Sequence, residues 1–263
     1  MIVVYILVGL YGLCVGSFLN VVIYRLPNNM NLAKPGSHCT TCGYELRWYD
    51  NIPVLSYLTL GGKCRKCKEH ISFRYTLVEL LNMALWLLSA WLFWETSWLY
   101  SIAVMLFCSL LICIGFIDLE TMYIHDLLVY LLAVPIVMAG VAYVLDMDDP
   151  ALIVNRLIGV AVGGGLFLAV WLVFRLVMKK EGMGIADVIL MAFVGAFLGW
   201  EATIVAMLIA SLLGCAILIP IQFIRKKERD TEYPFAPFLT LGAVAAVFVT
   251  EPLLGWYLGL CGF

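Results

Sequence analysis

Long apolar runs separated by short polar segments dominate the chain. Splitting the sequence at its charged positions gives apolar runs near residues 2–23, 77–94, 98–117, 127–145, 157–178, 188–200, 202–224 and 236–258. Most of these runs approach the ~20 residues that a helix needs to cross the hydrocarbon layer of a bilayer. The pattern therefore predicts an all-α polytopic membrane protein with eight transmembrane helices, the first of them retained rather than removed as a signal peptide.

The sixth apolar run is shorter than the others. Only 13 residues separate Asp187 from Glu201, and at ~1.5 Å per residue they span roughly 20 Å of a layer about 30 Å thick. A helix that begins below the membrane surface would explain this length and would place Asp187 within the membrane, after the small-residue segment 182–186. Irregular backbone at that depth requires surrounding protein or a water-filled cavity, so we expect a cavity beside Asp187.

Composition and charge agree with a membrane protein. The 263 residues are 64% hydrophobic and 13% charged, with a mean hydropathy of +1.01. Of the 16 basic residues, 15 lie in the segments 24–76, 175–187 and 225–233, and Arg156 is the exception. Because cytoplasmic loops carry the excess of Lys and Arg, we expect these segments in the cytoplasm and both termini outside. The net charge of −2 gives no indication of nucleic-acid binding.

Two CxxC pairs occupy the longest polar segment. Cys39 and Cys42 are separated by 21 residues from Cys64 and Cys67, a spacing typical of a tetrahedral zinc site in a reducing compartment. A reversible dithiol and a metal-free loop are the alternatives. We interpret the zinc as structural, since a loop of this length has few apolar anchors of its own. The predicted division is therefore a first transmembrane helix at 1–23, a cytoplasmic zinc-binding loop at 24–76 and a seven-helix membrane domain at 77–263.

Two carboxylates lie at the ends of apolar runs on the predicted cytoplasmic side. Asp118 ends the third run and Asp187 opens the sixth. Acidic side chains at the membrane edge are costly and mark functional sites, and two of them at matching depth indicate a pair that shares one proton. One carboxylate would act as a general base on water while the other polarises a carbonyl, as in aspartic proteolysis. The alternative is that each residue is a helix cap or a lipid-surface side chain.

Several ordered motifs resemble those of the type IV prepilin peptidase family. They are Gly16-Ser-Phe-Leu-Asn20 with Tyr24-Arg25-Leu26-Pro27, the two CxxC pairs, the segment 48–57, Ser72-Phe73-Arg74-Tyr75 with Val78-Glu79-Leu80-Leu81, Ile117-Asp118, and Gly182-Met183-Gly184 leading to Asp187. The similarity runs along essentially the whole chain.

This resemblance implies an inner-membrane enzyme of the GxGD aspartyl protease class, with Asp118 and Asp187 as the catalytic pair. Members cut the basic leader of type IV prepilins or type II secretion pseudopilins after Gly, at the cytoplasmic face of the bilayer. Many then methylate the new N-terminal residue with S-adenosylmethionine. Residues that could contact the substrate are Gly182, Gly184, Ala186 and Asp126.

The sequence departs from the family pattern near the predicted catalytic pair. Ala186 replaces the second glycine of GxGD, Ile189 stands where Lys is common, and Ala236 replaces a Gly. A Cβ at position 186 is unfavourable if the backbone needs positive φ there, and harmless if the residue is helical. We also expect Asp126 to cap the fourth span. Glu79 fits either the helix dipole or a polar interior contact, and the helix dipole is slightly preferred.

Two rival functions follow from the same residues. In an ion-coupled transporter the two aspartates would bind a coupling ion or relay protons, although the two halves of the chain show no internal repeat. In a catalytically inactive variant the protein would serve as a zinc-braced scaffold for the pilus or secretion machinery.

Overall fold

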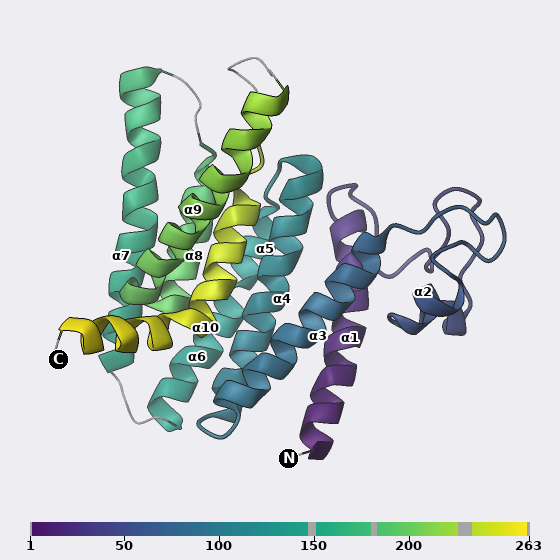
Figure 1. Ribbon diagram of the computed structural model, residues 1–263, viewed down its shortest axis with the longest axis horizontal. Coiled ribbons are helices and arrows are strands. Elements are labelled where there is room, and N and C mark those ends of the chain that lie inside the picture. The colour runs from purple at the N-terminus through teal and green to yellow at the C-terminus, as the bar shows by residue number, and fades with distance from the viewer. Residues whose placement is uncertain (1, 147–150, 180–182, 226–232, 262–263) are drawn as a thin grey trace. The chain divides into compact units, whose positions relative to one another are not determined.

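A computed structural model of the chain describes residues 2–146, 151–179, 183–225 and 233–261. Figure 1 shows its helical elements. In order they are α1 (Ile2–Arg25), η1 (Trp48–Asn51), α2 (Leu55–Thr59), α3 (Phe73–Phe93), α4 (Trp98–Thr121), α5 (Asp126–Leu131), α6 (Ala133–Leu145), α7 (Ala151–Leu172), η2 (Val173–Met178), α8 (Ile185–Leu198), α9 (Trp200–Arg225) and α10 (Ala236–Cys261).

The predicted fold class is confirmed. Among the described residues, seven helical segments are long and apolar enough to cross a membrane. The remaining predicted span is α8, which has only 14 residues, so its shortness agrees with the sequence. The predicted span 127–145 is divided at Leu132 into α5 and α6. Pro135 lies in the first turn of α6 and has no N–H for the carbonyl of Leu131, which explains the interruption.

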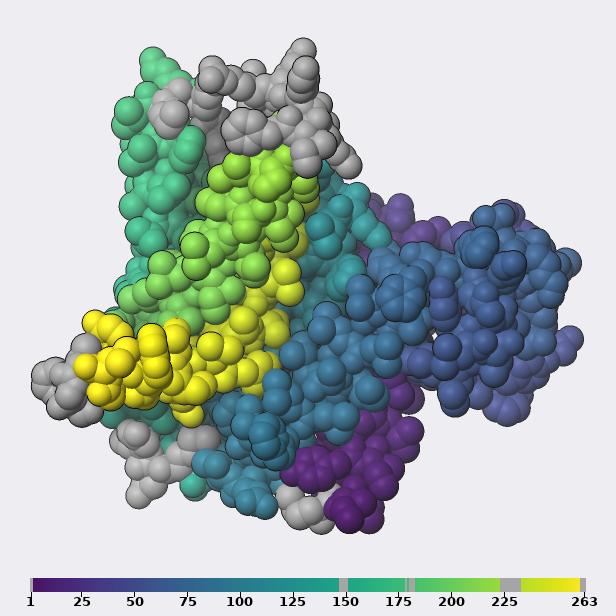
Figure 2. Space-filling view, in the orientation of Figure 1, coloured from purple at the N-terminus to yellow at the C-terminus, as the bar shows by residue number. Residues whose placement is uncertain are grey.

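The chain forms two compact units, Met1–Ser101 and Ile102–Phe263. In the first unit, α1 packs along α3, and the segment between them forms a lobe that carries the cysteines (Figure 2). Glycines allow the close approach of the two helices: a Cβ at Gly16 would lie 2.7 Å from the Cα of Glu79, and one at Gly12 would lie 3.0 Å from the Cα of Met83. The amide of Asn82 donates to the carbonyl of Gly12 at 2.7 Å, which adds a polar contact between the helices.

In the second unit, α8 packs against α7 at backbone distance. A Cβ at Gly159 of α7 would lie 2.2 Å from the carbonyl oxygen of Gly195 of α8, and a Cβ at Gly163 would lie 2.3 Å from that of Met191. Small residues permit such approach between membrane helices, where lipid provides no hydrophobic driving force for association. The position of the short helix α8 therefore depends on glycines in both helices.

Two further contacts join α4 to α8 and α10. The rings of Phe107 in α4 and Phe197 in α8 stack with centroids 3.9 Å apart. A Cβ at Gly115 in α4 would lie 2.6 Å from the hydroxyl oxygen of Thr240 in α10. These contacts bring the C-terminal half of α4 next to both helices.

We expect Gly159→Ala to destabilise the protein while Gly165→Ala, on the same helix, does not. The methyl group at 159 would overlap backbone of α8 and of Gly199, whereas a Cβ at 165 meets nothing within 4 Å. Overpacking costs about 1–3 kcal/mol, and an unhindered Gly→Ala change in a helix gains up to about 1 kcal/mol. Thermal unfolding of both variants in detergent measures the difference. Equal midpoints would contradict the close packing of α7 and α8.

Candidate active site and metal centre

Asp118 lies near the C-terminal end of α4 and is 5% exposed. Its Oδ2 accepts a hydrogen bond from the backbone N–H of Ala236 at 3.1 Å. Ala236 is the first residue of α10, so the positive end of that helix points toward the carboxylate. A buried carboxylate needs such donors, because burial removes the water that would otherwise solvate its charge.

Asp187 lies in the first turn of α8 and is 8% exposed. Its carboxyl group is close enough to Asp118 for the two charges to interact. Gly184 precedes the helix as its N-cap, and a Cβ at Gly184 would lie 3.5 Å from the Oδ2 of Asp187. The structure thus brings together the two carboxylates that the sequence analysis paired, from separate helices and across 69 positions of sequence.

The residues predicted to contact the substrate do not all lie beside the two aspartates. Gly184 lies beside Asp187, and Ala186 is the second residue of α8, half-buried. Gly182 lies outside the described residues. Asp126 is exposed and is the first residue of α5, with His125 at the cap position and no side-chain cap hydrogen bond. The expectation that Asp126 caps this helix is therefore wrong, because Asp126 is itself helical and the helix begins one residue earlier than a cap at 126 requires.

The helical position of Ala186 decides the question raised by its departure from the GxGD pattern. The residue does not have positive φ, in contrast to five other non-glycine residues of the described chain. A Cβ at this position therefore costs no backbone strain, and alanine is the better helix former. Ile189 lies three residues further along α8 and is also half-buried.

We expect Ala186→Gly to lower the stability of the protein by about 0.5–1 kcal/mol, the difference in helix propensity between the two residues. The rate of substrate cleavage should stay within about twofold of the parent rate. The substitution changes the stability of the folded state and does not change the reacting groups. Chemical or thermal unfolding and a cleavage assay test the two parts separately. A large gain of activity would show that the alanine obstructs the site.

The four cysteines of the two CxxC pairs converge. Their sulfur atoms all lie within 4.8 Å of one another, with Sγ–Sγ distances of 3.8 Å between Cys39 and Cys67 and 4.0 Å between Cys42 and Cys64. Zinc bound at about 2.3 Å to four sulfurs places those sulfurs about 3.8 Å apart at the corners of a tetrahedron. The cluster therefore fits a zinc ion.

Each CxxC pair lies in a tight turn whose amides face sulfur. The N–H of Gly43 donates to the carbonyl of Cys39, and that of Lys68 donates to the carbonyl of Cys64. Gly43 and Lys68 occupy equivalent places and have φ of 67° and 62°. Backbone N–H groups of Cys67 and Lys66 lower the pKa of the Cys64 thiol to about 6, whereas burial and hydrogen bonds to the other thiols raise the pKa of Cys67 to about 12. Donors to sulfur favour the thiolate, which is the form that binds metal.

An ion pair supports the same lobe. Arg65, next to Cys64, donates through Nε and an Nη to Oδ1 of the buried Asp50 at 2.8 and 2.7 Å. The Arg65 hydrogen bonds hold the pKa of Asp50 below its usual value. The hydroxyl of Tyr44 donates to Oδ2 of the same carboxylate, so the second CxxC turn is tied to η1.

We expect the purified protein to contain about one zinc ion per chain, and Cys42→Ser or Cys64→Ser to lose most of it, since a structural site requires all four ligands. Cys14→Ser removes an exposed cysteine of α1 outside the cluster and should leave the metal content unchanged. Elemental analysis of the three variants measures the effect. Full zinc content in either ligand variant would contradict a four-cysteine site.

Glu79 is a residue whose setting the sequence left open. It is 8% exposed, its Oε2 accepts from the N–H of Val54 at 2.8 Å, and Ser17 lies close enough to interact with the same carboxyl. The polar interior contact is therefore correct, and the slight preference for the helix dipole is not. Polar residues inside otherwise apolar runs, Ser17 and Asn20 in α1 and Glu79 in α3, were the available signal.

An all-helical membrane protein with two buried aspartates close enough for their charges to interact has the arrangement of a membrane aspartyl protease. Two family descriptions match the chain: the bacterial peptidase A24 N-terminal domain over residues 10–93 and the type IV leader peptidase family over residues 105–219. The chain belongs to the type IV leader peptidase family, and it is a multi-pass protein of the inner membrane.

Relatives match over most of the chain. A Pseudomonas aeruginosa protein named prepilin leader peptidase/N-methyltransferase is 35% identical, covering 97% of this chain and 93% of its own length. A Legionella pneumophila protein of the same name is 34% identical, covering 97% and 94%. One from Myxococcus xanthus is 40% identical over 78% of this chain and 59% of its own. No solved structure matches the chain.

Proposed function

We propose that this protein is a prepilin leader peptidase and N-methyltransferase. It cleaves the basic leader of a type IV prepilin or type II secretion pseudopilin after Gly at the cytoplasmic face of the membrane, and then methylates the new N-terminal residue. The observation that carries the protease assignment is the pair of buried carboxylates, Asp118 and Asp187, whose charges interact across α4 and α8. The names of relatives that match nearly the whole chain support both activities.

The two aspartates act as a unit that shares one proton. The ionised carboxyl takes a proton from a water molecule as the water oxygen attacks the scissile carbonyl carbon, and the protonated carboxyl donates to the carbonyl oxygen. The tetrahedral intermediate collapses when a proton passes to the leaving amine. The amide of Ala236 holds one oxygen of Asp118, so α10 fixes the orientation of this carboxylate before substrate arrives.

The distribution of basic residues gives the orientation. We place the cysteine lobe and the segment around Asp187 in the cytoplasm and both termini outside, because 15 of the 16 Lys and Arg residues then lie inside. A basic leader crosses the bilayer poorly, so the scissile bond of the substrate stays at the face where both aspartates lie. The apolar helix of the substrate remains in the bilayer.

The four cysteines hold zinc in a structural role, and the first unit holds the methyl donor. A cavity of about 360 Å³ lies beside the cysteines, with the buried carboxylates of Asp50 and Glu79 in its lining. Its size and its polar and aromatic lining fit a donor such as S-adenosylmethionine. Tyr44, Tyr57 and His70 also line the cavity and would hold the adenine ring by stacking. When bound, this group supplies the methyl carbon on a positively charged sulfur.

We expect Asp118→Asn and Asp187→Asn each to lower leader cleavage by at least about a hundredfold, because each removes one partner of an acid–base pair. The assay follows shortening of a prepilin in proteoliposomes. Glu201→Gln, at the exposed start of α9, is the matched control and should cleave at the parent rate. Thermal unfolding of all variants checks that the fold is intact.

Three results would overturn the assignment. Cleavage that survives either Asn variant would exclude the aspartate pair. A parent protein that cleaves no prepilin, both as it stands and with Ala186→Gly, would favour an inactive scaffold. Uptake of an ion that depends on both aspartates, without cleavage, would favour a transporter.

A further inference from the structure

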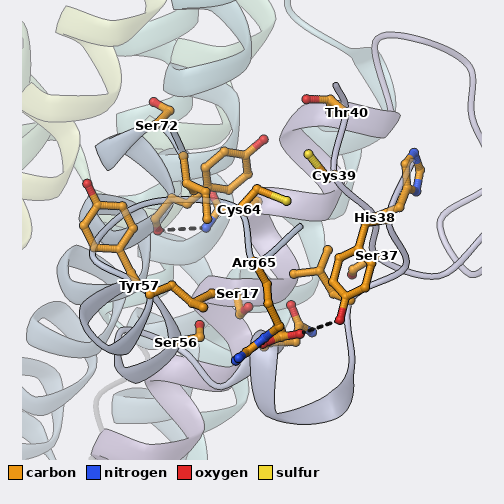
Figure 3. A pocket seen from close by; sticks show the side chains of 18 of the residues that line it. Ser17, Ser37, His38, Cys39, Thr40, Ser56, Tyr57, Cys64, Arg65 and Ser72 are labelled. Carbon is orange, nitrogen blue, oxygen red and sulfur yellow. Dashed lines mark hydrogen bonds and ion pairs between the residues drawn. The ribbon is translucent and has the colours of Figure 1, made fainter. Parts of the chain in front are cut away.

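The cavity of the first unit contains a buried carboxylate without a cation. Glu79 lines it, receives a hydrogen bond from the N–H of Val54, and lies close enough to Ser17 to interact with it. Within the part of the chain that the structure describes, the ion pair found is Arg65 with Asp50, and none involves Glu79. A buried charge is costly unless it is paired. The site is therefore complementary to a positively charged ligand. Figure 3 shows Ser17, Ser56, Tyr57 and Arg65 around this cavity.

A second group in the same cavity lacks a hydrogen-bond donor. Asn20 is 4% exposed, and its Nδ2 donates to the carbonyls of Gly16 and Tyr75. Its Oδ1 is buried and has no partner among the described residues. Nearly all buried polar atoms in proteins have a partner, so Oδ1 indicates a ligand that brings an N–H or O–H donor.

The other buried charged side chains of the lining are already satisfied. Asp50 is bound by Arg65 and Tyr44. Arg25 donates its guanidinium hydrogens to three backbone carbonyls, those of Asn31, Leu32 and Gly36. Glu79 is therefore the buried carboxylate of this cavity that a ligand can neutralise.

The backbone that contacts Glu79 is strained. Val54 has φ of 61°, a conformation that β-branched residues rarely adopt. Its N–H points to Oε2 of Glu79 in this conformation. Strain of this kind persists where the surroundings impose it, commonly at ligand sites. The loop before α2 is thus held against the glutamate.

We propose that Glu79, Asn20 and Ser17 bind a primary amine, the free N-terminus of the cleaved substrate, and that Glu79 removes its proton during methyl transfer. This inference rests on the proposed methyltransferase function. An ammonium group offers three N–H donors to the carboxylate and to Asn20 Oδ1, whereas a sulfonium offers none. The three residues lie on the membrane helices α1 and α3, where a substrate helix that stays in the bilayer can present its N-terminus.

Glu79 and the methyl donor together account for each proton moved and each bond formed or broken in the transfer. The ammonium gives one proton to Glu79, which frees the nitrogen lone pair. The nitrogen then forms a bond to the methyl carbon of the sulfonium donor while the carbon–sulfur bond breaks and its electron pair stays on sulfur. The product leaves as a methylated ammonium, which now carries the positive charge of the sulfonium, together with a neutral thioether, and Glu79 returns its proton to water. Ser17 and the amide of Val54 keep the carboxylate facing the nitrogen.

The test is binding of a peptide in the absence of methyl donor, so that the readout does not depend on turnover. The probe is a synthetic peptide with the N-terminal sequence of a mature type IV pilin, starting with Phe, with either a free or an acetylated N-terminus. We expect the parent to prefer the free amine by about tenfold or more, as a charge-assisted hydrogen bond gives. Glu79→Gln, which preserves shape and can still accept from Val54, should abolish this preference.

Controls separate this inference from the proposed function. Glu45→Gln changes an exposed carboxylate of the same lobe outside the cavity and should keep the preference and the methylation rate. Leader cleavage and zinc content of Glu79→Gln should equal those of the parent, which shows that the fold is intact. Labelled methyl transfer to the peptide should fall by at least about a hundredfold in Glu79→Gln.

Several outcomes would overturn the proposal. If the parent methylates the peptide, and Glu79→Gln keeps both the preference for the free amine and the parent methylation rate, then Glu79 is not part of the site. A primary ammonium is also part of S-adenosylmethionine, so weaker binding of that donor to Glu79→Gln, with the peptide preference unchanged, assigns the cluster to the donor instead. A parent that cleaves but transfers no methyl group refutes the methyltransferase function and this inference together.

Discussion

The backbone contact between α7 and α8 is the constraint on which the catalytic arrangement depends. Helix α8 has 14 residues, too few to be located by spanning the bilayer from one surface to the other. Its position comes instead from Gly159, Gly163 and Gly195, which let two helices approach until carbonyl oxygens replace side chains at the interface. Asp187 is in the first turn of this helix, so any shift of α8 along α7 moves the carboxylate.

The opposite end of α8 is fixed as well. Gly199 ends the helix with φ of 84°, which an L side chain rarely adopts. The next residue, Trp200, donates its N–H to Oδ1 of Asn155 on α7 at 3.1 Å. The stacked rings of Phe107 and Phe197 then relate α8 to α4. Both aspartates are thus held by helices whose separation is set by contacts far from the carboxylates.

The sequence predicted the helices and the paired aspartates but not how they are held. Hydropathy located the spans because each needs about 20 apolar residues, and Asp118 and Asp187 were visible because charge is rare in such runs. The hydrogen bond from the backbone amide of Ala236 to Asp118 was not predictable. The two residues lie 118 positions apart in the sequence, and the donor is a backbone group, which any residue type could supply. The doubt about Ala186 also required coordinates, because a motif does not say whether its second position is helical or left-handed.

In the first unit, too, a close contact between two helices positions the polar side chains. Gly16 brings α1 so close to α3 that a Cβ would lie 2.7 Å from the Cα of Glu79, and Ser17 and Asn20 line the same cavity as this carboxylate. A purely structural polar contact between two membrane helices would use donors and acceptors in equal number, as Asn82 does with Gly12. Here the carboxylate of Glu79 and the Oδ1 of Asn20 face one cavity, so hydrogen-bond acceptors outnumber donors. Packing alone does not explain that excess, whereas a ligand with N–H donors does.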